Sequence, residues 1–429
     1  MNGILSAGMP SPLRPHPQTP RFPNVGSMQP LPPQLGQKAG GLKVVLIGNA
    51  LPRRCGIATF TTDLERALHA TPDVRESAIV AITDHGQDYL YPAKVCRTLH
   101  QNQREDYRAA ADYINAQGFD VACIQHEFGI FGGEAGGYIL DLAERLTIPL
   151  VVTLHTVLDH PTPIQRLVMA RLLALCAGVV VMARKARAIL IGIYGVDPAD
   201  IRVIPHGIPD VAWSSPASAK ARLGFGSRSV ILTFGLIGPG KGIETMIEAM
   251  PAILVQIPDA VYVVMGATHP QLLANGCDHY RETLMARVQA LGIADHVVFL
   301  NRFFDSGELL DHIGMCDVYV TPYLVEAQMT SGTLAISHGL GRPVVSTPYW
   351  HAAELLADGS GRLVPFGNSA ALGACVAELL ADDEARLQLA QHAYAASRPA
   401  IWAHVAQHYA RLFARTRTNA AAARHRHSG

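Results

Sequence analysis

A glycine-rich turn in the second half of the chain carries a lysine suited to binding an anion. The segment "FGLIGPGKGIETM" places Lys241 between Gly240 and Gly242, directly before a helical pattern. A lysine on such a turn puts a positive charge beside backbone N–H donors, and this arrangement suits a phosphate. It is not the P-loop pattern G-x-x-x-x-G-K-[ST], because Ile243 follows Gly242. A solvated surface lysine is the alternative interpretation.

A second candidate anion site is the run of hydroxyl and glycine residues Thr330, Ser331, Gly332 and Thr333. A helix that begins there would present free N–H groups and hydroxyls at its positive end. An ordinary helix N-cap needs only one such residue. Three hydroxyls with a glycine among them therefore favour an anion site over a simple cap.

Two histidines end apolar runs in the first half of the chain. His126 follows "VACIQ", and His155 ends "PLVVTLH". A lone histidine at a strand end is more often structural than catalytic, but two of them beside polar or glycine-rich loops indicate a site. Gly56, in the turn "PRRCGIATF", would let a ligand approach the backbone at a helix N-terminus. A plain strand–helix turn is the alternative for Gly56.

Trp350 and His351 come just after the apolar run "PVVSTP". A tryptophan at the end of a strand can stack on a base or a sugar. It can equally be a core aromatic residue in a loop, and the sequence leaves both interpretations open.

Several classes of protein and site are disfavoured by what the sequence lacks. It has no D-x-D, H-E-x-x-H, G-x-S-x-G or Cys/His ligand spacing, so we expect no metal site and no nucleophilic serine. Lys and Arg together equal Asp and Glu at 35 each, and this balance argues against nucleic-acid binding through bulk charge. Seven cysteines without a C-x-x-C pair are typical of reduced thiols in a cytoplasmic protein.

The elements that must position these residues follow an alternating pattern. Short runs of Val, Ile and Leu, such as "KVVLIG" and "GVVVM", alternate with helical patterns such as "GIETMIEAMPAIL". Strands that are almost wholly apolar are buried on both faces, and this predicts parallel sheets covered by helices. We therefore expect an α/β protein with two Rossmann-like, doubly wound domains that face each other across a cleft. Ligands bind such sheets at the carboxyl ends of the strands, where most of the candidate residues lie.

The predicted organisation has five parts. They are a disordered Pro/Gly-rich lead (1–40), an N-terminal Rossmann-like acceptor domain (41–211), a C-terminal Rossmann-like nucleotide-sugar domain (212–398), a crossing helix (399–414) and a disordered tail (415–429). The lead and the tail lack the apolar periodicity that a packed core needs. The names given to the two domains rest on the resemblance described next.

Four segments resemble the family 4 glycosyltransferases of the GT-B fold: "FGLIGPGKGIETMIEA", "VIPHGIPD", "VVTLHT" and "GLGRPVVSTPYWHAAELLADGSGRLVPFGN". The resemblance runs from about residue 43 to about residue 413. It implies transfer of a hexose from a nucleoside-diphosphate sugar to a hydroxyl acceptor, with retention at the anomeric carbon and without metal or cofactor. It also implies that the C-terminal domain holds the donor and that the last helix crosses back to the first domain.

By this resemblance Gly56 lines the diphosphate and sugar, His155 lies near the transferred sugar, and Lys241 neutralises the leaving diphosphate. Together with the local patterns it gives three groups of candidates: catalytic, His155, Lys241 and Gln328; donor-binding, Gly56, Gly240, Lys241, Glu326, Thr330, Ser331, Gly332 and Thr333; acceptor or sugar side, His126, Trp350 and His351.

The chain departs from the family pattern at three positions. Leu236 stands where the family usually has an arginine in G-R-L-x-x-x-K-G, which removes one cation for the phosphates. The family's E-x7-E pair becomes Gln328 and Ile336. Gln328 can still bond a sugar hydroxyl, whereas Ile336 cannot bond a ribose, and Glu326 is a candidate substitute.

These departures keep other functions open. One is a non-catalytic protein that binds a nucleotide or a glycan, and another is a sugar-nucleotide epimerase or a phosphorylase on the same fold. The expected partners are a UDP-hexose or GDP-mannose donor and a glycan or small hydroxylated acceptor. The apolar helix predicted over 162–178 carries little positive charge, so it favours burial over membrane binding. We expect a cytoplasmic protein whose membrane contact is at most peripheral, at the inner face.

Overall fold

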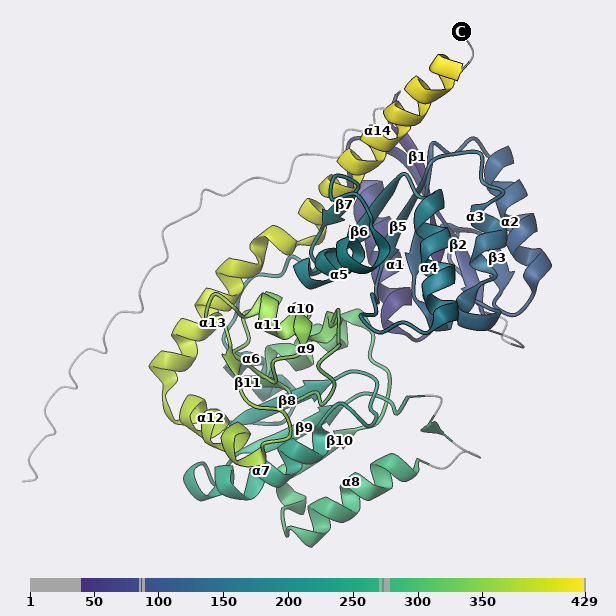
Figure 1. Cartoon of the computed structure of the whole chain (residues 1–429). Helices are drawn as coiled ribbons and strands as arrows, with labels where there is room; N and C mark the ends of the chain where they lie inside the picture. The colour runs from purple at the N-terminus through teal and green to yellow at the C-terminus, as the bar shows by residue number, and fades with distance from the viewer. Residues whose placement is uncertain (1–39, 85, 87–88, 270–271, 274–277, 428–429) are drawn as a thin grey trace, which may run out of the picture. The chain divides into compact units, whose positions relative to one another are not determined.

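The strands of the chain form two parallel sheets (Figure 1) in the computed structural model, which describes residues 40–84, 86, 89–269, 272–273 and 278–427. Nearly all of the predicted N-terminal lead lies outside these residues. The first sheet has the order β3-β2-β1-β4-β5-β6-β7 and the second the order β10-β9-β8-β11-β12-β13. Every pairing is parallel. The prediction of two Rossmann-like units is confirmed.

The strands of the first sheet are β1 (Leu42–Gly48), β2 (Val74–Thr83), β3 (Val95–His100), β4 (Val121–His126), β5 (Leu150–Leu154), β6 (Gly178–Val181) and β7 (Ile201–Val203). The strands of the second are β8 (Val230–Phe234), β9 (Val261–Met265), β10 (Val297–Leu300), β11 (Val318–Thr321), β12 (Val344–Ser346) and β13 (Arg362–Leu363).

The helices that accompany the first sheet are α1 (Gly56–Ala70), α2 (Arg104–Ala116), α3 (Ile139–Ala143), α4 (Pro163–Leu175) and α5 (Arg184–Tyr194), with short 3₁₀ turns η1 (Phe128–Ile130) and η2 (Glu134–Gly136). Those after β7 are α6 (Pro216–Arg222), α7 (Ile243–Gln256), α8 (His279–Ala290), η4 (Ala294–His296), α9 (Ser306–Gly314), α10 (Gly332–Gly339), α11 (Trp350–Leu355), α12 (Ser369–Ala381), α13 (Asp383–Ser397), η5 (Arg398–Ala400) and α14 (Trp402–His427). Across the part of the chain that the structure describes, none of these helices has the length and apolarity needed to cross a membrane.

Both faces of each sheet are buried. In β1, Val45 and Ile47 belong to one apolar cluster while Val44 and Leu46 belong to another on the opposite face. This alternation follows from the two-residue period of a strand. It explains why most positions of these strands are apolar, and why most of the candidate polar residues lie at or beyond the strand ends.

Two segments connect the two sheets and contact each other where they pass. Ile208, in the linker after β7, accepts a hydrogen bond from the Trp402 N–H (3.0 Å) and donates one to the Ala400 carbonyl (2.9 Å). A Cβ atom at Gly207 would lie 2.2 Å from the Trp402 ring, so only glycine fits there. Helix α14 then packs on the first sheet, where the Tyr409 hydroxyl lies 2.9 Å from the Thr153 hydroxyl.

Helix α14 continues through most of the tail for which the sequence predicts disorder. It extends to His427, and Thr416 within it is buried with its hydroxyl bonded to the Leu412 carbonyl (2.8 Å). The alanines of this segment favour helix strongly, and the packing of Thr416 on the first sheet adds a tertiary contact. A search for apolar periodicity alone does not detect either effect.

Candidate active site

The turn that carries Lys241 is held against the end of β11. Gly240 and Gly242 have φ values of +85° and +67°, a region that glycine adopts without strain. A Cβ atom at Gly242 would lie 1.8 Å from the Pro322 carbonyl oxygen, and the Leu324 N–H donates to the Gly240 carbonyl (2.8 Å). The glycines therefore let this turn pack on the backbone that follows β11, and that packing sets the position of Lys241.

The Lys241 ammonium lies over the ring of Tyr323, 4.1 Å from its centroid. The Tyr323 hydroxyl is 3.1 Å from the Thr333 hydroxyl, which is itself 3.1 Å from the Ser331 hydroxyl. Burial raises the pKa of Tyr323, but the Lys241 charge and hydrogen bonding with Thr333 and Ser331 together bring that pKa below its ordinary value. A line of polar groups thus joins Lys241 to the start of α10.

The N-terminus of α10 is built from the predicted hydroxyl cluster. Ser331 is the N-cap, and its hydroxyl accepts from the Leu334 N–H (3.3 Å). Its own N–H donates to Nδ1 of His351 (2.8 Å). The N–H groups of Gly332 and Thr333 lie in the first turn, where a helix offers them no internal partner. These two N–H groups and the positive end of the helix can therefore receive an anion.

His351 and Trp350 have structural partners. His351 is buried and accepts the Ser331 N–H, and its pKa falls to about 3, chiefly through burial and then through His206 and His338. Trp350 packs against the apolar core of the first sheet, with the Lys185 ammonium 5.0 Å from its ring centroid. Both residues thus fix α10 and α11 in place, and the stacking role considered for Trp350 remains a prediction.

The backbone carbonyls of Glu326 and Gln328 both accept hydrogen bonds from the start of α11, from the Trp350 N–H (3.0 Å) and the His351 N–H (3.3 Å) respectively. The Gln328 side-chain amide donates to the Thr330 carbonyl (2.7 Å), and Glu326 is exposed. Ile336 packs against the apolar cluster on one face of the second sheet. The position at which the family has its ribose-binding glutamate is therefore part of the hydrophobic packing here.

His155 lies at the carboxyl end of β5, where its Nε2 faces the Gln125 side-chain oxygen at 3.1 Å. Because the Gln125 side-chain oxygen only accepts, Nε2 is the nitrogen that carries the proton in this contact, and Nδ1 carries the lone pair. The ring also packs edge-on against Phe60, with centroids 4.8 Å apart. Burial, followed by the neighbouring His206 and His126, lowers the pKa of His155 to about 3. The imidazole is therefore neutral at pH 7.

His126 is fully buried, and neither of its ring nitrogens has a hydrogen-bond partner among the described residues. Its ring packs against Phe128 and Phe131, with centroids 5.0 and 5.7 Å away. Burial lowers its pKa to about 4. The predicted acceptor-side role would require the glycine-rich loop after β4 to move, because His126 has no exposed surface in this arrangement.

His206 was not among the predicted site residues, yet it joins the two sheets at the candidate site. A Cβ atom at Gly332 would lie 2.9 Å from His206 Nε2, so the histidine touches the start of α10. On its other side the ring lies 5.1 Å from Phe60, the residue that also contacts His155. His206 lies in "VIPHGIPD", one of the segments that resemble the family, but a histidine in a linker follows no periodic pattern that would mark it as functional.

Glu354 makes a second contact between the two sheets that the sequence did not predict. Both of its carboxylate oxygens accept from the Arg184 N–H at 2.8 Å, and one also accepts from the Lys185 N–H at 3.3 Å. These are N–H groups at the start of α5, so a carboxylate of α11 occupies the N-terminus of a helix from the first sheet.

Gly56 is the first residue of α1, so the helix begins about one turn earlier than the expected start near Thr59 to Thr62, and a Cβ atom at Gly56 would meet no atom within 4 Å. Local packing therefore does not require glycine at this position. The N-cap is Cys55, whose sulfur accepts from the Ala58 N–H at 3.3 Å.

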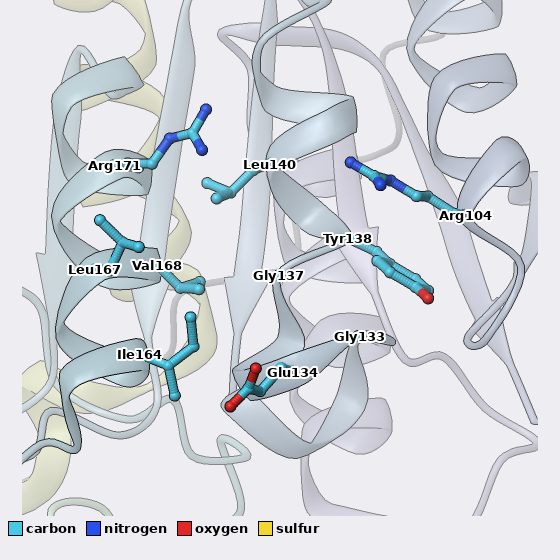
Figure 2. Close-up of a pocket in the computed structure, with 10 residues that line it drawn as sticks. All are labelled: Arg104, Gly133, Glu134, Gly137, Tyr138, Leu140, Ile164, Leu167, Val168 and Arg171. Carbon is cyan, nitrogen blue, oxygen red and sulfur yellow. The ribbon is translucent and has the colours of Figure 1, made fainter.

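A hollow of about 230 Å³ lies between η2, α3 and α4 (Figure 2). Leu140, Ile164 and Leu167 give it aliphatic walls. Arg104 pairs with Asp141 (2.8 Å), and Arg171 pairs with Glu144. None of the predicted site residues lines this hollow, so it is separate from the groups described above.

Two family models match the chain. The model described as "Glycosyltransferase Family 4" matches residues 55–211, and that described as "Glycosyl transferases group 1" matches residues 217–396. The first match covers most of the first sheet with its helices, and the second covers the whole second sheet and includes both the Lys241 turn and α10.

Among curated proteins, the chain is 29% identical over 194 residues to the "GDP-mannose-dependent alpha-(1-6)-phosphatidylinositol monomannoside mannosyltransferase" of Mycolicibacterium smegmatis, which covers 43% of this chain and 48% of that protein. It is 27% identical over 284 residues to the "D-inositol 3-phosphate glycosyltransferase" of Stackebrandtia nassauensis, covering 62% of each. The chain thus spans about half to three-fifths of the length of these relatives.

Among solved structures, HepE of Anabaena in complex with UDP superposes with a TM-score of 0.70 at 18% identity, covering 87% of this chain and 100% of that one. At this level of identity the likeness shows a shared fold.

Proposed function

Because the chain belongs to family 4 of the glycosyltransferases, we propose that it moves a hexose from a nucleoside-diphosphate sugar to a hydroxyl acceptor. The proposal includes retention at the anomeric carbon and independence from metal ions. One relative is named as GDP-mannose-dependent, and a structural neighbour was solved with UDP. These are the two donor classes that we propose for this chain.

The observation that carries the proposal is the line of groups from Lys241 through Tyr323 and Thr333 to the first-turn N–H groups of α10. The difficult step is the departure of a nucleoside diphosphate, which develops negative charge. Fixed donors and a cation at the place where that charge develops lower the barrier. In this proposal Lys241 and the α10 N-terminus perform that task, and no metal is required.

The proposed bond changes are balanced without a protein nucleophile. The bond between the anomeric carbon and the phosphate oxygen breaks while the acceptor oxygen bonds to that carbon on the same face. The acceptor's proton passes to the departing phosphate oxygen. His155 is neutral, and its Nδ1 lone pair suits it to accept a hydrogen bond from a sugar hydroxyl. We therefore assign His155 to holding the sugar rather than to transferring a proton.

The acceptor that we propose is a glycan or a small hydroxylated molecule. The relatives are named for phosphatidylinositol monomannoside and for D-inositol 3-phosphate, and both carry an inositol ring with free hydroxyls. We place the reaction in the cytoplasm, with membrane contact that is at most peripheral.

A non-catalytic function is the second candidate, and Ile336 is the observation that favours it. Because its side chain packs in an apolar cluster, the ribose of a donor loses a carboxylate partner. Leu236 likewise removes a cation beside the Lys241 turn. A protein of this kind would bind nucleotide without turning over the donor.

A donor panel tests both candidates. Purified protein is incubated with UDP-glucose, UDP-galactose, UDP-N-acetylglucosamine, GDP-mannose and ADP-glucose in EDTA, with and without inositol as a trial acceptor, and release of nucleoside diphosphate is followed. Release from one donor, with the configuration of the product read by NMR, supports the transferase and identifies its base and sugar. Tight nucleotide binding by calorimetry without release from any donor would instead support the non-catalytic function.

A further inference from the structure

A groove of about 220 Å³ runs between the edge strand β7 and helix α14. Its floor is aliphatic, formed by Ile204 and Leu412, and its rim carries the guanidinium groups of Arg202, Arg411 and Arg415. Val203 and His408 complete the lining, and we call these seven residues the basic groove. None of the predicted site residues belongs to it.

Among the residues that the structure describes, no carboxylate forms an ion pair with the arginines of the basic groove. Nη1 of Arg202 donates to the carbonyls of Ala199 (2.8 Å) and Ile201 (3.1 Å), and Nη2 of Arg415 donates to the same Ala199 carbonyl (3.4 Å). Arg411 makes no hydrogen bond or ion pair within the described part of the chain. Two like charges thus share one carbonyl oxygen, and a third stands beside them.

The pKa of Arg202 reflects this crowding. Burial lowers it, and the neighbouring Arg415 and Arg187 lower it further, while Asp200 alone opposes them. His408, also on α14, completes the rim. A site that gathers positive groups in this way, in a chain whose formal charge is zero, gains most from an anion that accepts hydrogen bonds from several guanidinium groups.

The hollow of Figure 2 provides the contrast. It too carries two arginines, but Arg104 pairs with Asp141 and Arg171 with Glu144. There the protein supplies its own anions, so the arginines stabilise the fold. In the basic groove no carboxylate of the described chain pairs with Arg202, Arg411 or Arg415, which leaves the anion to be supplied from outside.

We propose that the basic groove binds a phosphate group, as a mono- or diester, carried either by a small soluble molecule or by a lipid headgroup. Arginine recognises phosphate through two parallel N–H bonds. The groove, at about 220 Å³, has room for more than a bare phosphate. The extra room, over an aliphatic floor, suits the organic part of an ester.

The groove bridges two stretches of chain that are far apart in sequence. Arg202 lies on β7, which leads into the linker between the sheets, and Arg411 and Arg415 lie on α14, which follows the second connection. A bound phosphate ester therefore joins β7 to α14. Val203 is 39% exposed and is the large apolar side chain that the groove presents to solvent, so the groove suits recognition of a headgroup rather than insertion into a bilayer.

Calorimetry with glycerol 3-phosphate and with inorganic pyrophosphate tests the site, using Lys241→Ala as the parent protein so that the proposed donor site contributes less. We expect saturable binding that Arg411→Gln weakens at least tenfold and that the double variant Arg202→Gln/Arg415→Gln abolishes. Arg411→Gln is the decisive variant, because Arg411 supports no other described residue and its loss should leave folding unchanged. Arg66→Gln, an exposed arginine of α1, is the matched control and should bind as the parent does.

Vesicles separate the two sources of phosphate. Co-sedimentation with phosphatidylglycerol in phosphatidylcholine, but not with phosphatidylcholine alone, and its loss in Arg411→Gln would assign a lipid headgroup. Binding of the soluble probes without co-sedimentation would assign a soluble ester. No binding of either kind, or binding that Arg411→Gln leaves unchanged, would overturn the proposal, whatever the outcome of the donor panel.

Discussion

The carboxyl edges of the two sheets meet at His206, but they carry opposite kinds of chemistry. At the second sheet's edge stand Lys241, the hydroxyls of Ser331 and Thr333, and the N-terminus of α10. At the first sheet's edge, His126 and His155 are held neutral by burial. The carboxyl edge of the second sheet suits the binding of a negatively charged group, and that of the first sheet suits the binding of neutral polar groups.

The two sheets share one fold but carry different side chains at their carboxyl ends. Parallel sheets place ligands at their carboxyl ends in both halves, so topology alone does not say which ligand goes where. The side chains at the strand ends determine which ligand each sheet binds. A diphosphate needs cations and N–H donors, whereas a sugar needs uncharged partners that both donate and accept. The four predictions below test this comparison, the largest expected effect first.

Removing the cation of the second sheet should have the largest effect. We expect Lys241→Ala to lower kcat about 10²- to 10³-fold, because the loss falls on charge that develops in the transition state. KM for the donor should change less. Initial rates of nucleoside-diphosphate release measure both constants.

Lys185→Ala is the matched control, because it also removes an ammonium from an aromatic face, here that of Trp350. It should leave kcat within about threefold. An equal loss of kcat in the two variants would mean that Lys241 acts through packing on Tyr323. The carboxyl edge of the second sheet would then not be the place where negative charge is stabilised.

Protonating the first sheet's histidines should destabilise the protein. His126 and His155 have folded-state pKa values of about 4 and about 3, below the value near 6.5 of an unfolded histidine. Between those limits the unfolded chain binds more protons, so stability is complete above about pH 6.5 and falls as the pH is lowered. Each histidine contributes a slope of up to about 1.4 kcal/mol per pH unit.

Thermal unfolding between pH 8 and pH 5 measures the summed slope, to which His206, His338 and His351 also contribute because burial lowers their pKa values in the same way. The variant His126→Leu should reduce the pH dependence of the free energy of unfolding by the contribution of one histidine. His160→Leu, at a fully exposed site, should leave it unchanged. A midpoint that stays constant down to pH 5 would show that these imidazoles are not held neutral.

Replacing His155 should cost about tenfold in kcat/KM, or about 1.4 kcal/mol, the size of one hydrogen bond to the sugar. We expect His155→Ala to act in this way and the rate of the wild-type protein to show no inflection near pH 6.5, because the imidazole does not titrate there. An inflection near that pH that disappears in His155→Ala would assign a proton-transfer role to His155 and would remove the contrast between the two edges.

Much of the fold could be predicted from the sequence because buried parallel strands are apolar along most of their length. β1, β4 and β8 are of this kind. β2 was missed because it begins with the polar residues Arg75, Glu76 and Ser77, and β3 because it is a half-exposed edge strand. Both depart from the pattern for physical reasons that a single sequence does not reveal.

The candidate site was only partly predictable for a different reason. The Lys241 turn and the hydroxyl cluster could be predicted from the local sequence, because glycines with positive φ and helix N-caps both require particular residue types. The contacts of His206 with Gly332 and of Glu354 with Arg184 join residues more than a hundred positions apart. No periodicity links such residues, and only the folded arrangement brings them together.

The smallest expected effect concerns the contact of Glu354 with α5, where the two sheets are joined by a charge. Neutralising this carboxylate with Glu354→Gln keeps one acceptor oxygen for the Arg184 N–H but removes its attraction to the positive end of the helix. Such interactions contribute about 0.3–1 kcal/mol, so the thermal midpoint should fall by a few degrees at most. Added salt should reduce the difference, since screening weakens the charge in the wild-type protein alone.

Glu144→Gln, which breaks an exposed ion pair with Arg171 on the first sheet, is the matched control and should change the midpoint less. If Glu354→Gln unfolds at the wild-type temperature at low salt, then contacts of Trp350 and His206, rather than this carboxylate, stabilise the packing between the two sheets.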